Sequence, residues 1–578
     1  MKKIRAYLCI VIAIFLLVAC GNGGGDTPKD EQGGNTQPPS GTPQGETPSV
    51  GAGSEGINWD EHVNYSWWLI ATIGDFFDSY NGNPVVNYME ERFNVSFDFV
   101  QPVIGTESDS LSILMGTGNY TDLISLAVYS GSIPQLYNDG IIIDIAEWLE
   151  YMPNLQNLLN TYPDFNRAAR DDEGRILVIP MMADESELTW AGLMYRHDIL
   201  DAMTGGNVQF PSGENRPTTL ADWEWMLPLM KEYYETAGFP DFAPLIIPAN
   251  GIFAFGELMS TFGVYGASFY VRNNEVHHDL TDPRMYDYVS TMRDWYAKGW
   301  IHQDFASRTD DLFFMPNPQL VFGGGAGVFY GMMMHLGDRM SIPEYGMFFD
   351  VRPISSPKGE GVTDKDIIRR GWDRFSSGAA NAIHSGADNI GRLLSTLDHL
   401  YSDEGAMLTT IGLNADQITP GRVHDIMSNM GLLDGAYWFD GAGNLVLNPN
   451  MQLMGGNVGT VDANGVRLGG YQRFSLINAA SSEEALDAHQ AWGGHDSVTE
   501  VHPLPGALSL TDEESATVSL NNSRMTDHFN QHMAMFIMGT MPLNESTWSE
   551  FVNEQRSLGL DENLAIQRAA FARYLARG

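Results

Sequence analysis

From about residue 57 onward, the chain alternates short apolar segments of strand character with amphipathic segments of helix character. Residues 65–70, 95–100 and 122–127 predict three strands. The stretch that starts at Asn83-Pro84 predicts an amphipathic helix between the first two strands. A βαβαβ succession predicts a parallel sheet with helices on its faces, and the alternation continues to the end of the sequence. We therefore predict an α/β fold.

The first twenty residues have the organisation of an export signal. Three cations in residues 1–5 precede an apolar run over residues 6–18, which is too short to span a bilayer comfortably. The run ends in Leu17-Val18-Ala19-Cys20-Gly21, which resembles the lipobox of bacterial lipoproteins. That resemblance implies a signal peptide at 1–19 and a diacylglycerol on Cys20. The alternative is a plain secretory signal in which Cys20 is incidental.

Residues 20–56 predict a lipidated cysteine followed by a disordered tether. The stretch is rich in Gly, Pro, Thr, Ser, Gln and Asp and nearly lacks large apolar side chains. No other stretch approaches the eighteen consecutive apolar residues that roughly mark a membrane span. We expect an exported protein that a lipid anchors to the outer face of the bacterial cell membrane.

The charge balance excludes several classes of partner. The 578 residues carry 32 Lys and Arg against 73 Asp and Glu, a net charge of −41. Phosphate contacts need cations, so this excess argues against nucleic-acid binding and against attachment through acidic lipid head groups. Because both cysteines, Cys9 and Cys20, lie in the leader, the body has no disulfide, thiolate nucleophile or cysteine metal ligand.

Several segments, in the correct order, carry a resemblance to one family. They are Asn83 to Val95, Gly118 to Ile124 (with Thr121 where proline is common), Asp172 to Pro180, Tyr195 to Leu200, and Leu397 to Gly405. They resemble motifs of the family 1 extracellular solute-binding proteins of ABC importers, in particular the large lipoprotein subgroup of Gram-positive bacteria. A C-terminal run from Phe536 through Trp548, Gly559 and Gln567 to Tyr574 also fits, and together the segments cover nearly the whole body.

The resemblance implies a two-lobed periplasmic-binding-protein-like fold of type II. Each lobe would be a sheet flanked by helices, with the ligand cleft between the lobes. We assign residues 57–185 and 345–400 to lobe 1, and residues 186–344 and 401–578 to lobe 2. The implied function is not enzymatic: a monomer without cofactor or metal captures a sugar or oligosaccharide by hinge closure and delivers it to the permease subunits of an ABC importer.

Aromatic residues supply the candidates for ligand binding. Aromatic rings stack on the apolar faces of sugars, while Asp, Asn and Arg bond the hydroxyls. In α/β receptors such groups belong at loops beyond strand ends. By that position the candidates are Asp75, Phe76 and Phe77 after the first strand, Tyr129 and Ser130 after the third, and Trp190, Phe253, Phe255, Tyr330, Trp372 and Arg374 on the second lobe or the crossovers.

Two other functions stay open. A peptide or another polar solute could be the ligand on the same fold. A surface glycoside hydrolase would need facing carboxylates, for which Asp75 with Asp78 is one pair, although solvated acidic surface explains such pairs equally well. His277 and His278 suggest a metal, but adjacent residues of a hairpin point to opposite faces.

Overall fold

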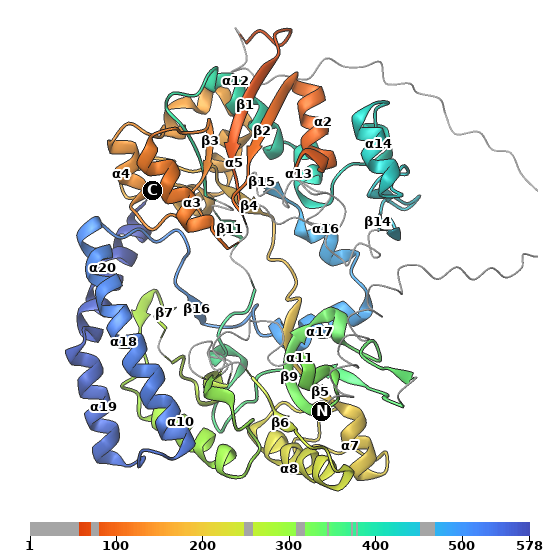
Figure 1. Cartoon of the computed structure of the whole chain (residues 1–578), viewed down its shortest axis with the longest axis vertical. Coiled ribbons are helices and arrows are strands. Elements are labelled where there is room, and N and C mark those ends of the chain that lie inside the picture. The colour runs from red at the N-terminus through yellow and green to blue at the C-terminus, as the bar shows by residue number, and fades with distance from the viewer. Residues whose placement is uncertain are drawn as a thin grey trace, which may run out of the picture.

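The computed structural model describes residues 57–70, 80–103, 105–247, 252, 258–266, 268–307, 318–343, 346–371, 374–376, 380–450 and 469–577. The fold is a mixed α/β fold of two lobes, each built on a sheet flanked by helices (Figure 1). We call the lobe around β1 lobe 1 and the lobe around β5 lobe 2. The predicted fold class is confirmed.

Lobe 1 contains the parallel unit that the sequence predicts. Strand β1 (Val63–Trp68) pairs in parallel with β2 (Val95–Val100) on one side and β3 (Leu123–Ser125) on the other. Strand β12 (Asn381–Ile383) adds to β3 in the antiparallel direction. Both faces of β1 are covered, with Trp67 and Trp68 at 0% and 1% exposure, as expected of a strand inside an α/β sheet.

Helices cover both faces of this sheet. Helix α2 begins at Pro84 because the Asn83 side chain accepts hydrogen bonds from the amides of Val85 and Val86, a strong N-cap. The helices of lobe 1 are η2 (Tyr80–Gly82), α2 (Pro84–Phe93), α3 (Glu107–Thr117), α4 (Ile133–Asn138), η3 (Ile145–Tyr151), α5 (Pro153–Thr161), α6 (Pro163–Ala169), α12 (Ile390–Asp398), η9 (His399–Tyr401), α13 (Asp403–Thr410), η10 (Ala415–Gln417) and α14 (Arg422–Asn429).

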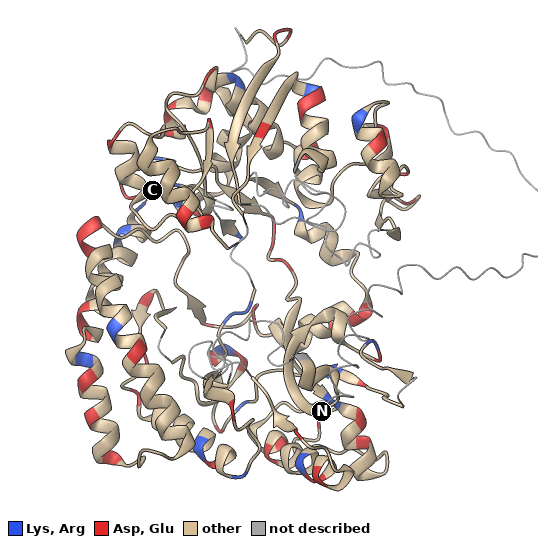
Figure 2. Ribbon diagram, viewed as in Figure 1, with Lys and Arg blue, Asp and Glu red and all other residues tan. Residues whose placement is uncertain are grey.

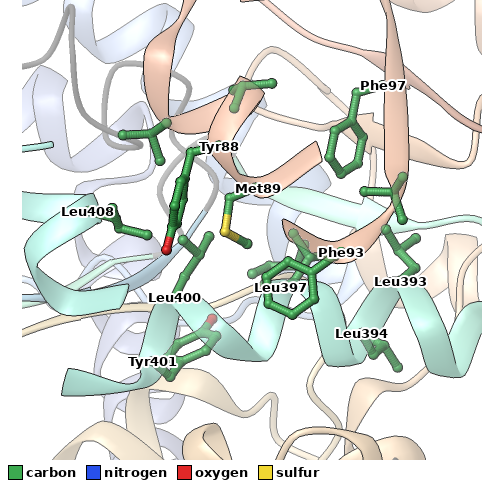
Figure 3. Close-up of a cluster of buried hydrophobic side chains, with 14 of the residues drawn as sticks. Tyr88, Met89, Phe93, Phe97, Leu393, Leu394, Leu397, Leu400, Tyr401 and Leu408 are labelled. Carbon is green, nitrogen blue, oxygen red and sulfur yellow. The ribbon is translucent and has the colours of Figure 1, made fainter. Parts of the chain in front are cut away.

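The core of lobe 1 joins segments that lie about 300 residues apart in the chain. Tyr88, Met89 and Phe93 of α2 pack against Leu397 of α12 and Leu408 of α13 (Figure 3). The hairpin of β13 (Tyr437–Phe439) and β14 (Leu445–Leu447) turns through Asp440 and Gly441 and contributes Tyr437 to the same core.

Lobe 2 has a four-stranded sheet in the order β10-β5-β9-β6. Its strands are β5 (Ala191–Arg196), β6 (Ala243–Leu245), β9 (Ala326–Met332) and β10 (Val351–Pro353), and a smaller sheet contains β7 (Tyr270–Arg272), β8 (Glu275–His277) and β16 (Val501–Pro503). Its helices are α7 (His197–Thr204), α8 (Leu220–Ala237), η4 (Met259–Phe262), α10 (Pro283–Ala297), η5 (Phe305–Ser307), α11 (Pro318–Phe322), η6 (Met333–His335), η8 (Asp364–Asp366), α17 (Glu483–Gly493), α18 (Asp512–Met538), α19 (Glu545–Ser557) and α20 (Leu560–Ala576).

A third sheet marks the place where the chain passes between the lobes. Strand β4 (Met181–Ala183) pairs with β11 (Phe375–Ser376) and with β15 (Gly470–Gln472), and each of the three strands adjoins a crossover segment. Helix α16 (Phe474–Ala479) follows β15. In Figure 1 these strands lie on the side of lobe 1 that faces lobe 2.

The pairing moves two of the predicted boundaries. We expected residues 345–400 in lobe 1, but β10 pairs with β5 in the sheet of lobe 2. We expected residues 401–578 in lobe 2, but Leu408, Val423 and Tyr437 are buried in the core of lobe 1. The third crossover therefore follows β15 instead of residue 400, because a segment belongs to the core that buries its apolar face.

Acidic residues are spread over the helices of both lobes, and basic residues are fewer (Figure 2). Within the described residues, no helix combines the length and the hydropathy that a membrane span requires. The predicted signal peptide, Cys20 and the tether all lie outside the described residues.

Candidate functional site between the lobes

A cavity of about 550 Å³ lies where the two lobes meet. Lobe 1 and the crossover strands provide one wall, and the loop that leads into α18 provides the other. The lining residues are 131–134, Phe165, 168–171, Arg175, Leu177, Val178, Pro180 and Phe375 on the first wall, and 506–510, Asp512 and Ser515 on the second. A volume of this size lies within the usual range for small-molecule sites.

Two phenylalanines make the apolar part of the first wall. Phe165 of α6 and Phe375 of β11 stack with ring centroids 5.8 Å apart and an interplanar angle of 29°. Phe165 is almost fully buried, at 1% exposure, so its position is fixed by the core of lobe 1. Phe375 packs on that ring from the crossover side. Because Phe165 is buried, Phe375 is the ring that offers an aromatic surface of the kind on which the C–H face of a sugar stacks.

The polar part of the first wall is a loop held by its own hydrogen bonds. The Asp171 carboxylate accepts from the amide of Arg175 at 2.9 Å and from its guanidinium at 2.7 Å. Arg170 donates to the carbonyl of Gly174 at 2.5 Å. These bonds fix the loop before any ligand arrives, which lowers the entropy lost on binding.

The second wall begins in a loop and ends in the first turn of α18. The Thr511 hydroxyl accepts from the amide of Glu514, and the Glu514 carboxylate accepts from the amide of Thr511, a complete capping box. The cap places Asp512 and Ser515 toward the cavity, beside the backbone of residues 506–510. This wall therefore offers hydroxyl, carboxylate and peptide groups to a polar ligand.

Formal charges balance in the lining. Arg170 and Arg175 are its two arginines, and Asp171 and Asp512 are its two aspartates. A cavity with balanced charge favours an uncharged polar ligand, since an ion would leave one sign uncompensated after it lost its water. The surrounding surface is strongly acidic and adds repulsion toward anions.

A buried arginine lies at the lobe 2 end of the second crossover. The Arg370 guanidinium donates to the carbonyl of Ala191 at 3.1 Å and to the Tyr330 hydroxyl, and burial lowers its pKa to about 10. The Asp496 carboxylate accepts from the amides of Arg370 and Gly371 at 2.9 and 2.6 Å. These contacts tie the second crossover to lobe 2.

Glu187 lies in the first crossover. Burial raises the pKa of its carboxyl to about 7, because the charged form loses hydration there. A crossover carboxyl that titrates near neutral pH makes the stability of this segment sensitive to pH.

The structure places the predicted ligand-binding residues in different surroundings. Tyr129 and Ser130 directly precede the lining residue Gly131, against which the Tyr129 ring packs. Burial raises the pKa of the Tyr129 hydroxyl. Arg374 lies beside the lining residue Phe375, with its guanidinium 5.5 Å from that ring, and donates to the carbonyl of Ala183.

Trp190 and Tyr330 belong to the core of lobe 2. Tyr330 is 6% exposed and bonded to Arg370, while Trp190 is half-buried against the same core. Neither lines the cavity. The other six candidates lie outside the described residues: Asp75, Phe76, Phe77, Phe253, Phe255 and Trp372.

Sequence reasoning missed Phe165, Phe375 and the whole second wall. Phe165 follows the Tyr162-Pro163 helix start, which gives no sign of a cavity. The sequence contains one signal for the loop before α18. Thr511, followed three residues later by Glu514, marks the start of a helix shortly after Leu504-Pro505-Gly506. The local sequence does not show that this loop faces lobe 1 across a cavity.

Among the described residues, no group of three or more His, Cys, Asp and Glu is placed to hold a metal ion. His277, the last residue of β8, and His278, which follows it, point in different directions, as expected of adjacent residues in a hairpin. His277 stacks on Tyr270, with centroids 5.6 Å apart, while His278 packs against Phe269 at 4.9 Å.

Several solved structures with the same fold are binding proteins. An extracellular solute-binding protein from Bifidobacterium longum subsp. infantis superposes with a TM-score of 0.67 at 16% identity, over 89% of this chain and 99% of that chain. The alginate-binding protein AlgQ2 superposes at 0.63, with 16% identity over 89% and 98% of the two chains. The S. pneumoniae ABC-transporter substrate-binding protein FusA in complex with kestose does so at 0.62, with 16% identity over 89% and 100%.

This chain has the fold of the extracellular solute-binding proteins. No family model matches its sequence, and no curated protein sequence matches it significantly. The likeness is therefore carried by the three-dimensional arrangement, which spans nearly the whole of both lobes.

Proposed function

We propose that this protein is the extracellular substrate-binding lipoprotein of an ABC transporter and that its ligand is a neutral sugar or oligosaccharide. The cavity between the lobes carries the proposal: it combines a stacked aromatic pair, a polar second wall and balanced charge in about 550 Å³. The ligand would contact both lobes, so binding favours the closed arrangement of the lobes over an open one. Capture and release then need no covalent chemistry.

The fold supports this function. Neighbours with TM-scores above 0.5 include a kestose complex and an alginate-binding protein, both receptors for carbohydrates. The anchor rests on the lipobox-like residues 17–21, and the permease partner rests on the transporter role of this fold. In this proposal the lipid on Cys20 and the tether keep the receptor next to the permease subunits.

A thermal-unfolding screen tests the ligand class. The purified chain is heated with neutral oligosaccharides, with acidic oligosaccharides and with peptides, and a ligand that binds the folded form raises the midpoint by mass action. We expect a rise with one or more neutral glycans. A rise with peptides alone would refute the sugar assignment. Release of reducing ends from the bound glycan would refute a purely binding role and favour a hydrolase.

The aromatic pair provides a sharper test. Phe375→Ala removes one ring of the stack, and we expect the affinity for the glycan found in the screen to fall by roughly 0.5–1.5 kcal/mol. Phe348→Ala is the matched control, because Phe348 is 66% exposed and does not line the cavity. Equal affinities of the two variants would place the ligand elsewhere.

Lipid attachment is tested separately. We expect the wild-type chain, expressed in a Gram-positive host, to incorporate a labelled fatty acid and to remain with the membrane fraction. Cys20→Ser should abolish the label and release the protein into the medium. A labelled Cys20→Ser protein would contradict the assignment of the anchor.

A further inference from the structure

The C-terminal helix reaches across from lobe 2 and touches lobe 1 next to the cavity. In Figure 1 the end of α20 lies beside lobe 1, although the rest of the helix packs on α18 and β8 in lobe 2. Two arginines one helical turn apart, Arg573 and Arg577, both bond the carboxylate of Asp172 in lobe 1. These contacts join the lobes in addition to the three covalent crossovers.

Arg577 bonds both walls of the cavity with one guanidinium. Nη2 and Nε donate to Asp172 Oδ1 at 2.6 and 2.9 Å, and Nη1 donates to the carbonyl of Arg170 at 2.7 Å. The same Nη1 donates to the carbonyl of Ala507 at 2.8 Å. Arg170 lines the first wall and Ala507 lines the second. The rigid guanidinium therefore sets the distance between the walls at this end of the cavity.

Arg573 repeats the arrangement one turn earlier. Its Nε donates to Asp172 Oδ2 at 2.7 Å, while Nη1 and Nη2 donate to the Glu514 carboxylate at 3.0 and 2.5 Å. Nη2 also donates to the carbonyl of Ser509, another residue of the second wall, at 3.2 Å. The bond to Arg573 lowers the pKa of Glu514, so this carboxylate stays charged at neutral pH.

Burial makes the Asp172 contact selective for one arrangement of the lobes. The Arg577 side chain is 4% exposed and that of Asp172 is 16% exposed. Separating the lobes would break several charge-assisted bonds at once, and a buried carboxylate that loses its partner is costly. The pair therefore favours the lobe spacing at which the cavity exists.

We infer that Arg577, supported by Arg573 and Asp172, is a positioning residue for ligand capture. It clamps the two cavity walls together before the ligand arrives, so that less of the binding free energy is spent on bringing the lobes together. The inference concerns the lobe spacing itself and rests on the proposed function only for its consequence, a change in ligand affinity.

The lobe spacing is measured without any ligand. In the full chain with serine at positions 9 and 20, cysteines at Ile113 on α3 and Leu520 on α18 are the sole thiols and carry spin labels. Both positions are exposed, at 66% and 53%, and they lie in different lobes. Pulsed electron resonance then gives the distribution of distances between the lobes for each variant.

Two substitutions each remove one partner of the contact between Asp172 in lobe 1 and Arg577 in lobe 2, which we call the clamp. Asp172→Asn removes the charge from lobe 1 with little change of shape, and Arg577→Gln removes the guanidinium from lobe 2. We expect both to shift the distribution to longer distances or to broaden it. Arg568→Gln is the control, because Arg568 lies on the same helix and donates to Val276 within lobe 2. Its distribution should equal that of the wild type.

The outcomes separate the clamp from simple damage to the fold. Unchanged distances in Asp172→Asn and Arg577→Gln would overturn the inference, whatever the protein binds. If the distances lengthen, the glycan from the thermal screen should bind roughly tenfold more weakly to both variants and normally to Arg568→Gln. Longer distances with unchanged affinity would also overturn the positioning role. Failure of every glycan to bind the wild type would refute the proposed function and leave the distance result standing.

Discussion

Leu397→Ala tests the joining of the early and late segments of lobe 1. Leu397 lies on α12 at 1% exposure and packs with Met89 and Phe93 of α2 (Figure 3). These partners come from the two sides of the crossovers, separated by about 300 residues of chain. The substitution removes three carbons from a contact that holds α12 against the first parallel unit.

The expected magnitude follows from the burial. A leucine this deeply buried loses its transfer free energy and leaves a cavity when it is cut to alanine, which costs about 3 kcal/mol and falls in a range of roughly 2.7–5.0 kcal/mol. The neighbouring side chains Tyr88 and Leu400 are themselves held by the same core, so they have little freedom to fill the space.

Urea unfolding, followed by tryptophan fluorescence and circular dichroism, measures the effect. The transition that reports on lobe 1 should move to lower urea with an unchanged slope. Leu520→Ala on α18 is the matched control, since Leu520 is 53% exposed and its loss should change the stability by less than about 0.5 kcal/mol. A loss below about 1 kcal/mol for Leu397→Ala, equal to that of the control, would refute the placement of residues 390–408 in the core of lobe 1.

Four further substitutions test other parts of the structure. Gly192→Ala should cost about 1–3 kcal/mol, because an added Cβ would lie 2.5 Å from the Trp492 ring, whereas Gly116→Ala in the open α3 helix should stabilise the protein by roughly 0.5–1 kcal/mol, both measured by urea unfolding. Asp222→Ala should lower the free energy of unfolding of lobe 2 by about 2 kcal/mol, because the backbone amides of Ser212, Thr218 and Thr219 lose the buried Asp222 carboxylate as their acceptor; an unchanged urea midpoint would contradict this role of Asp222. Glu187 holds its proton in the folded state up to pH about 7 and releases it near pH 4.5 in the unfolded state, so its contribution to the unfolding free energy should decrease as the pH rises between these values. Glu187→Gln should remove that decrease, and parallel pH profiles of the two proteins would show that burial does not shift this carboxyl.

Local sequence patterns predicted helices and strands correctly where one pattern, such as alternation or helical spacing of apolar residues, dominates the segment. The hairpin expected at His277 is formed by β7 and β8, and the unit from β1 to β3 is parallel as expected. Helix α18 spans Asp512–Met538. Polar residues interrupt its apolar pattern, and only the fold shows why: Asn521 donates to Asn563 and Glu562 of α20.

The lobe boundaries could not be derived in the same way. An apolar face at helical spacing shows that α13 and α14 must be buried, but it does not say against which sheet. The packing of Leu408 and Val423 places both helices in lobe 1, and the pairing with β5 places β10 in lobe 2. The register of a strand and the strand it pairs with are set only when the sheet assembles.

The sequence by itself determined the class of fold and the acidic character that disfavours anionic partners, and it predicts export and anchoring of the chain. These features rest on periodicity, on a contiguous leader and on composition, which are local or additive along the chain. Only the tertiary structure decided where the cavity lies and what clamps it. Phe165, Phe375 and the loop before α18 come together, and Arg577 reaches Asp172, because the packing of the two lobes brings distant segments within bonding distance.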